Sequence, residues 1–269
     1  MYESHWGLRQ PPFRNVLDPR RYFPGGSHEE ALARLHFLVD QGWRLGLVAG
    51  EAGTGKSLVL QVLASSLRHR GVTVAQVSLR GTEPDEFLWR LAAGMGMNPD
   101  TAQSPFTLWR SIDDQLAALR YQLRPLVLMF DSFDAVTAGV ASLVSRLVHT
   151  DELPGLKLNV ILAGRPYQRP NPGRDLLQMS DLRIDLAPWT HQETEDFVRH
   201  ALEQAGAERP LFTTAALARL YDLSHGLPRR VNQLAELALV AGAGQELDQI
   251  DAETVEGVFL ELSFADVAA

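Results

Sequence analysis

The segment from Gly50 to Ser57 constrains what this chain can fold into more than any other. It reads Gly-Glu-Ala-Gly-Thr-Gly-Lys-Ser and satisfies every position of the phosphate-binding pattern G-x-x-x-x-G-K-[ST]. Residues 44–48 before it read as a short buried strand, and residues 57–69 after it carry apolar side chains at helical spacing. The alternative is a glycine-rich turn that binds nothing, but the complete motif between a strand and a helix favours a nucleotide triphosphate as the ligand.

The residue types of this loop suit that chemistry. Glycines let consecutive backbone N–H groups point at anionic oxygens, and the following helix presents its positive N-terminal end to the same oxygens. Lys56 is expected to reach the β- and γ-phosphates, and the Ser57 hydroxyl to ligate Mg²⁺. We therefore expect ATP and Mg²⁺ as the cofactors. The predicted nucleotide-binding residues in this part of the chain are Gly50, Glu51, Ala52, Gly53, Thr54, Gly55, Lys56, Ser57 and Leu58.

A carboxylate follows the apolar strand predicted at 126–130. A nucleotide-hydrolysing protein with such a loop needs a carboxylate at the end of a neighbouring strand to hold Mg²⁺. We expect Ser57 and Asp131 to form this metal site; the alternative is a surface Asp leaving an ordinary strand. A turn after the strand would bring Asp134 toward the γ-phosphate as a proton acceptor. Without that base, the site binds ATP and hydrolyses it slowly.

The order of patterns predicts two folded parts after an irregular N-terminal arm at 1–27. Apolar strands alternate with helices over 28–188, which indicates an α/β domain whose parallel sheet is covered on both faces. From 189 to 269 only helices are expected. Further strands are predicted at 72–79, 158–163 and 183–186, and helices at 85–94, 107–122, 141–149, 191–205, 214–224, 228–240 and 252–262, with turns at Gly206, Gly226 and Gly242–Gly244.

Two helix starts carry a capping-box pattern, in which a Ser or Thr side chain and a Glu three residues later satisfy each other's backbone N–H groups. Ser27 and Glu30 form one such pair, and Thr190 and Glu193 form the other.

Composition limits the compartment and the partners. The chain has no cysteine, no apolar stretch long enough to span a bilayer and no secretory signal at its start, so we expect a cytoplasmic protein without direct membrane insertion. A net charge of −8 argues against a surface that generally attracts DNA. One loop is locally basic, with Arg165, Arg169 and Arg174. It could bind a phosphate or a partner, or simply be solvated.

Two further segments carry a resemblance to a known family. Residues 226–234 read Gly-Leu-Pro-Arg-Arg-Val-Asn-Gln-Leu, and the arm contains Trp6-Gly7-Leu8, Pro12-Phe13 and Asp18-Pro19-Arg20-Arg21-Tyr22-Phe23 before Ser27-His28-Glu29-Glu30-Ala31-Leu32. Together with the phosphate-binding loop and Asp131, these segments resemble the AAA+ ATPases of the general secretion pathway protein A type, over nearly the whole chain.

The resemblance implies an AAA+ core with a helical lid, Mg²⁺-ATP between them, and a homo-oligomeric ring or partial ring. It implies that Arg229 senses the γ-phosphate, so Lys56, Asp131, Asp134 and Arg229 are the predicted catalytic residues and Arg229 joins the nucleotide-binding set. It also implies that the arm and residues 28–32 border the adenine pocket, where Tyr22 and Phe23 either contact the base or pack in the core. Protein partners from a secretion or pilus system are expected.

Three positions depart from the family pattern. Ser132 stands where a hydrolytic Glu is expected, and a hydroxyl is a poor proton acceptor. Arg165 stands where the first sensor is usually neutral and polar, and Met179 where an arginine finger is expected; Arg165 and Arg174 remain candidates to replace that finger. Family members often continue into a membrane span and a peptidoglycan-binding domain, so with the chain ending at Ala269 we expect any envelope role to come through partners.

Three functions remain open at this point. The first is an ATP-dependent AAA+ switch or weak ATPase that serves a secretion or pilus-type assembly. The second is an ATP-dependent, DNA-associated adaptor like the AAA+ proteins that regulate transposition, favoured by Arg20, Arg21 and the loop at 165–174 and opposed by the acidic total. The third is a pseudo-ATPase scaffold that binds nucleotide without turnover.

Overall fold

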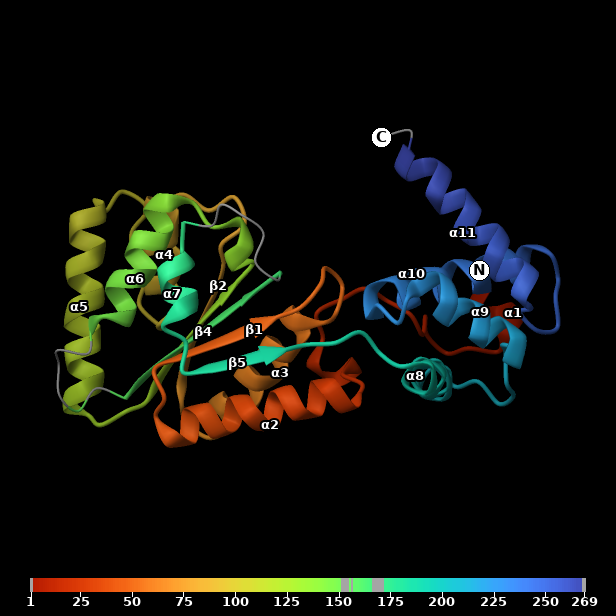
Figure 1. Cartoon of the computed structure of the whole chain (residues 1–269), viewed down its shortest axis with the longest axis horizontal. Coiled ribbons are helices and arrows are strands. Elements are labelled where there is room, and N and C mark those ends of the chain that lie inside the picture. Colours follow the sequence, from red (N-terminus) through yellow and green to blue (C-terminus); the bar gives the residue numbers. More distant parts are fainter. Residues whose placement is uncertain (1, 151–154, 156, 166–171, 268–269) are drawn as a thin grey trace.

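The protein consists of a sheet-containing body and a helical body, joined by two extended stretches of chain (Figure 1). The computed structural model describes residues 2–150, 155, 157–165 and 172–267, with the backbone alone for 263–267. Both termini lie at the helical end (Figure 1). No helix within these described ranges is long and apolar enough to cross a bilayer.

Five parallel strands form the sheet, in the order β2-β3-β4-β1-β5. Strands β1 and β4 are buried along their whole length, as their mostly apolar sequences predict; the buried Asn159 in β4 donates its amide to the Trp43 carbonyl at 2.6 Å. The register pairs Ala49 with Gly164 and Asp185, and Ser78 with Asp131, so the carboxyl ends of all five strands lie at one edge. The strands are β1 (Leu45–Ala49), β2 (Thr73–Ser78), β3 (Leu126–Asp131), β4 (Leu158–Gly164) and β5 (Leu182–Asp185).

Helices cover both faces of this sheet, which confirms the predicted three-layer α/β core. Helices α2 (Gly26–Gln41) and α3 (Lys56–His69) pack on one face, with Leu35 and Leu63 fully buried. The other face is covered by α4 (Pro84–Gly94), α5 (Pro105–Tyr121), α6 (Ala138–Val148) and the short α7 (Arg174–Gln178).

The helical body contains the C-terminal helices together with the start of the chain. Trp6 closes the five-residue helix α1 (Tyr2–Trp6) and donates its indole N–H to the Leu239 carbonyl at 2.8 Å. Phe13 packs in the same core. The first half of the arm therefore packs in the core of the helical body, with α1 as its one helical segment among the described residues. The remaining helices are α8 (His191–Gln204), α9 (Thr214–Ser224), α10 (Pro228–Gly244) and α11 (Ala252–Val267).

One predicted turn and one predicted cap are wrong. The helix predicted at 228–240 continues to Gly244. Gly242 is a position of close approach within it, since a Cβ there would lie 3.1 Å from the Trp6 ring. Ser27 does not cap α2, whose N-cap is Gly25. The Ser27 hydroxyl instead donates to the Ala187 carbonyl.

Glu193 explains why α2 needs no local cap. Its Oε2 atom accepts from the Thr190 N–H at 2.7 Å, which completes the predicted capping box of α8. Its Oε1 atom accepts from the Gly26 N–H at 2.6 Å, in the first turn of α2. One carboxylate thus accepts hydrogen bonds at the starts of α2 and α8 and joins the two bodies, although Gly26 and Glu193 are 167 positions apart.

Trp189 packs in the junction between the bodies. Its ring lies 4.6 Å from Phe197 and 5.7 Å from Phe23, and its backbone N–H donates to the Gly226 carbonyl at 2.8 Å. A Cβ at Gly226, where φ is +67°, would lie 2.0 Å from the Trp189 carbonyl oxygen. Only glycine fits this approach, which fixes the start of α10 against the linker after β5.

Candidate nucleotide site

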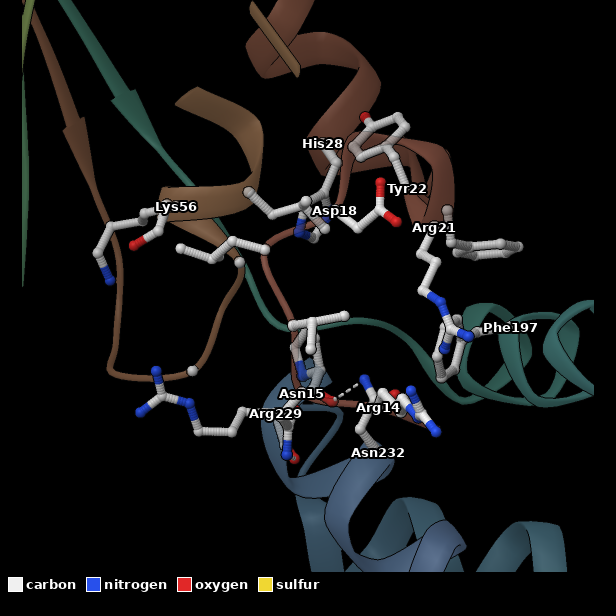
Figure 2. Close-up of a pocket in the computed structure, with 18 of the residues that line it drawn as sticks. Arg14, Asn15, Asp18, Arg21, Tyr22, His28, Lys56, Phe197, Arg229 and Asn232 are labelled. Carbon is white, nitrogen blue, oxygen red and sulfur yellow. Dashed lines mark hydrogen bonds between the residues drawn. The ribbon is translucent and has the colours of Figure 1, made fainter. Parts of the chain in front are cut away.

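A cavity of about 810 Å³ lies between the carboxyl edge of the sheet and the helical body. Its walls come from the arm, the Gly50–Ser57 loop, the chain after β3 and β4, and helices α8 and α10. Figure 2 shows Lys56 and Arg229 at one side of this space, with Arg14, Arg21 and Phe197 at the other. The cavity is therefore built by segments that are far apart in the sequence, between Gln10 and Asn232.

The Gly50–Ser57 loop has its predicted place between β1 and α3. Gly55 is the N-cap of α3 with φ of +94°, a conformation that favours glycine. The Lys56 ammonium donates to the carbonyls of Gly50 at 2.8 Å and Glu51 at 2.7 Å, across the mouth of the loop. Of the predicted nucleotide-binding residues here, those lining the cavity are Ala52, Gly53, Gly55, Lys56, Ser57 and Leu58, whereas Gly50, Glu51 and Thr54 are not among them.

Ser57 and Asp131 meet at the sheet edge. The Ser57 hydroxyl donates to Asp131 Oδ2, and Asp131 Oδ1 accepts from the Ser132 N–H at 2.7 Å. A hydroxyl and a carboxylate side by side are hard oxygen donors of the kind that fits Mg²⁺. No cluster of three His, Cys, Asp or Glu side chains occurs among the residues that the structure describes. Such a sparse oxygen set suits an ion that takes its other ligands from water and phosphate.

Asp134 lies at the cavity in an ion pair. Ser132 has φ of +59° and turns the chain into the short helix Phe133–Ala135. Asp134 Oδ2 accepts from Arg165 Nε at 2.8 Å, and Oδ1 accepts from the Arg165 backbone N–H at 3.1 Å. Burial raises the pKa of Asp134, but the hydrogen bonds from Arg165 outweigh burial and hold it below its usual value.

Arg229 reaches the same site from the lid. Its backbone N–H, in the first turn of α10, donates to the Gly53 carbonyl at 3.2 Å. The side chain of Arg229 lines the cavity, whereas that of Arg230 is not among the lining residues. Helix α10 thus starts directly against the Gly50–Ser57 loop.

His28, in the first turn of α2, contacts the Gly50–Ser57 loop. Its side chain is 3 % exposed, and Nε2–H donates to the Thr54 carbonyl at 2.8 Å. Burial lowers the pKa of His28 below its usual value, although the Thr54 carbonyl and Glu193 oppose the shift. A Cβ at Gly55 would lie 2.8 Å from Nε2, so the ring fills the space that the glycine leaves. The neutral imidazole therefore positions the loop.

Tyr22 is the arm residue whose chemistry best fits a ligand. Its ring lies 6.5 Å from that of His28, and burial raises its pKa to about 12. Its hydroxyl is buried and has no hydrogen-bond partner within the described part of the chain. A buried polar group without a partner is costly, and a bound ligand would satisfy it. Phe23 packs against Trp189 and Phe197, and all three rings also line the cavity.

The lining is positive although the chain is acidic. Among the described residues, seven cationic side chains and three carboxylates line the cavity of a protein with a net charge of −8. A concentration of positive charge in a partly enclosed space favours a polyanion. The cations are Arg14, Arg20, Arg21, Lys56, Arg80, Arg165 and Arg229, and the carboxylates are Asp18, Asp131 and Asp134.

Sequence reasoning missed several of these residues. It did not single out Arg80, yet this cation follows β2 at the sheet edge where ligands of parallel sheets bind, which was a usable signal. Arg14 carried no such signal. Met179, at the position expected for an arginine finger, is 50 % exposed. Arg174 opens α7 and is not among the lining residues, and Arg169 lies outside the described residues.

Residues 39–170 match the family described as AAA domain. The chain is also 30% identical over 245 residues to General secretion pathway protein A of Aeromonas hydrophila. The chain belongs to the AAA+ P-loop family, of the general secretion pathway protein A type. The match covers 90% of this chain but 45% of the relative, so the chain spans a little under half the length of that protein.

Two solved structures have a similar fold. The ORC1 protein of Aeropyrum pernix, solved in complex with DNA, has a TM-score of 0.71 at 17% identity, over 95% of this chain and 69% of that one. The Holliday junction branch migration motor RuvB of Thermotoga maritima has a TM-score of 0.59 at 16% identity, over 94% and 74%. These similarities show that the three proteins share the fold of an α/β core with a C-terminal helical part.

The position of His28 generates a prediction about stability and pH. Because the imidazole is buried with a lowered pKa, the unfolded chain binds the proton more readily. The free energy of unfolding should therefore fall as the pH drops below about 6.5. His28→Gln keeps an N–H donor near Nε2 but does not titrate, so its loss of stability between pH 7.5 and 5.5 should be smaller than that of the wild type, measured by urea denaturation.

His28→Ala removes the donor as well, and at pH 7.5 it should be less stable than His28→Gln by about 1–3 kcal/mol, the cost of a buried carbonyl without its partner. His36, whose pKa is also lowered by burial, contributes the slope that remains in both variants. Equal pH slopes in the wild type and His28→Gln would contradict a neutral, buried His28.

Proposed function

We propose that this protein binds Mg²⁺-ATP in the cavity between the sheet edge and the lid, and that it hydrolyses ATP slowly. The observation that carries the proposal is the meeting of Lys56, the Ser57–Asp131 pair and Arg229 at one side of a positively lined cavity. These groups come from the phosphate-binding loop, the end of a neighbouring strand and the lid, and their chemistry matches the needs of a triphosphate.

Each group has a separate part in binding. The N–H groups at the start of α3 donate to phosphate oxygens, and the Lys56 ammonium leaves its two carbonyl partners for the β- and γ-phosphates. Ser57 and Asp131 would hold Mg²⁺, which supplies charge neutralisation for the β- and γ-phosphate oxygens when bound. Arg229 carries a further cation from the lid to the γ-phosphate.

Slow hydrolysis follows from the residues after β3. Ser132, directly after Asp131, has no carboxylate to orient and deprotonate water. Asp134 is the candidate base, but its pairing with Arg165 lowers its pKa and thereby its strength as a proton acceptor. An arginine finger, which is worth about 10³–10⁵ in rate, is replaced by Met179 at the expected position.

The wider role proposed here is service to a secretion or pilus-type assembly, in the cytoplasm, as a homo-oligomeric ring or partial ring. The support is the similarity to General secretion pathway protein A over most of this chain. Assembly would bring a neighbour's residues to the open side of the cavity and is the natural means of raising a weak hydrolytic rate.

Removal of the Lys56 ammonium should abolish nucleotide binding. Lys56→Ala is expected to weaken the binding of fluorescent ATP at least 100-fold in the presence of Mg²⁺, because charge-assisted hydrogen bonds to the phosphates are lost. Lys157→Ala is the matched control, since Lys157 is exposed and not among the lining residues. Equal affinity of the two variants would show that the loop is not the binding site.

Substitution of Ser132 tests the cause of slow turnover. Ser132→Glu should raise the ATP hydrolysis rate at least 10-fold, because it supplies a carboxylate beside the metal-linked Asp131, and general-base catalysis is worth about 10²–10⁴. Ser132→Ala is the control and should leave the slow rate unchanged. Phosphate release is the measurement. A wild type that already turns over several ATP per second, with no gain in Ser132→Glu, would contradict a missing base.

A further inference from the structure

Arg165 and Asp134 form an ion pair in which the carboxylate is the more buried partner. The Asp134 side chain is 17 % exposed and that of Arg165 is 53 % exposed. Arg165 directly follows β4, and both residues line the cavity. The guanidinium thus lies at the solvent side of the pair, where it can change partner without unfolding of the sheet edge.

The surroundings of Lys56 place this pair close to the phosphate position. Burial lowers the pKa of Lys56; Asp131 and Asp134 oppose that shift, and Arg165 and Arg229 add to it. All four charges are therefore near enough to act on the ammonium. Three cations therefore lie in one region: Lys56 from α3, Arg165 from the end of β4 and Arg229 from α10. Of these three, Arg165 is the one whose guanidinium donates a hydrogen bond to a carboxylate, that of Asp134.

Carboxylate and phosphate compete for the same guanidinium, because both present oxygens in the geometry that an arginine fork recognises. We propose that Arg165 exchanges partners: it pairs with Asp134 when no γ-phosphate is present and binds the γ-phosphate when ATP enters the cavity. This inference rests on the proposed function, since it deepens the binding of Mg²⁺-ATP at the same site.

Two properties follow from the exchange. Arg165 makes the site prefer ATP over ADP, because ADP offers no γ-phosphate to draw the guanidinium away. The Asp134 carboxylate also loses its cation only when ATP is bound, so it becomes available as a hydrogen-bond acceptor in the ATP complex alone. Arg165 is thus a specificity-determining residue, and it positions Asp134 in the absence of ATP.

The test is a double-mutant cycle on nucleotide affinity rather than on activity. The dissociation constants of a non-hydrolysable ATP analogue and of ADP, both with Mg²⁺, are measured by calorimetry for the wild type, Arg165→Ala, Asp134→Asn and the double variant. Arg165→Ala should weaken binding of the analogue about 10-fold or more and change ADP binding less than 2-fold, because a charge-assisted hydrogen bond to the γ-phosphate is lost. Asp134→Asn should increase the affinity for the analogue several-fold, because Arg165 loses its competing partner.

The cycle separates exchange from a general charge effect. In the Arg165→Ala background, Asp134→Asn should give a clearly smaller gain, since the released guanidinium is absent. Arg165→Lys keeps the charge without the fork and should fall between the wild type and Arg165→Ala. Arg183→Ala is the matched control and should change neither affinity, because Arg183 pairs with Asp185 away from the cavity.

The outcomes are distinguishable. Two results would overturn the exchange while leaving ATP binding in place. One is an equal loss of affinity for the analogue and for ADP in Arg165→Ala; the other is an equal gain in analogue affinity from Asp134→Asn in both backgrounds. A wild type that binds neither nucleotide would overturn the proposed function and the exchange together. Circular dichroism on each variant shows that the fold is retained, and Arg165→Lys provides the result if Arg165→Ala does not fold.

Discussion

The parallel register of the sheet is the constraint on which the site depends. Because all five strands run in one direction, the chain leaves Ala49, Asp131 and Gly164 at the same edge, in adjacent strands or one strand apart. The Gly50–Ser57 loop follows Ala49, Arg165 follows Gly164, and Asp131 is itself the carboxylate proposed to hold Mg²⁺. A slip of one strand by a single residue would reverse the side chains that face the core and would separate the groups that must act together.

Coupling between the lid and the loop follows from two contacts on the outer side of that loop. The Gly53 carbonyl accepts from the first turn of α10, and the Thr54 carbonyl accepts from His28 in α2. These two loop carbonyls thus hold α10 and α2, while the Gly50 and Thr54 N–H groups donate to the Gly164 and Glu51 carbonyls. Glu193 links α2 to the lid at the same time. A ligand that orders the loop will therefore also order the interface between core and lid.

Local patterns predicted the parts of this structure that depend on nearby residues. The strand–loop–helix at Gly50–Ser57, the position of Asp131 at a strand end and the Thr190–Glu193 capping box are examples. The cap predicted at Ser27 was wrong because its replacement, Glu193, is distant in sequence. The positive lining could not be predicted from a net charge of −8, since folding alone decides which arginines face the cavity.

Hydrogen exchange at the backbone amides of residues 53–57 tests the central claim most directly. If these N–H groups bind the phosphates as proposed, saturating Mg²⁺-ATP should slow their exchange, whereas adenosine, which lacks phosphates, should not. Unchanged exchange at these amides under saturating Mg²⁺-ATP would contradict the assignment of this loop as the triphosphate site.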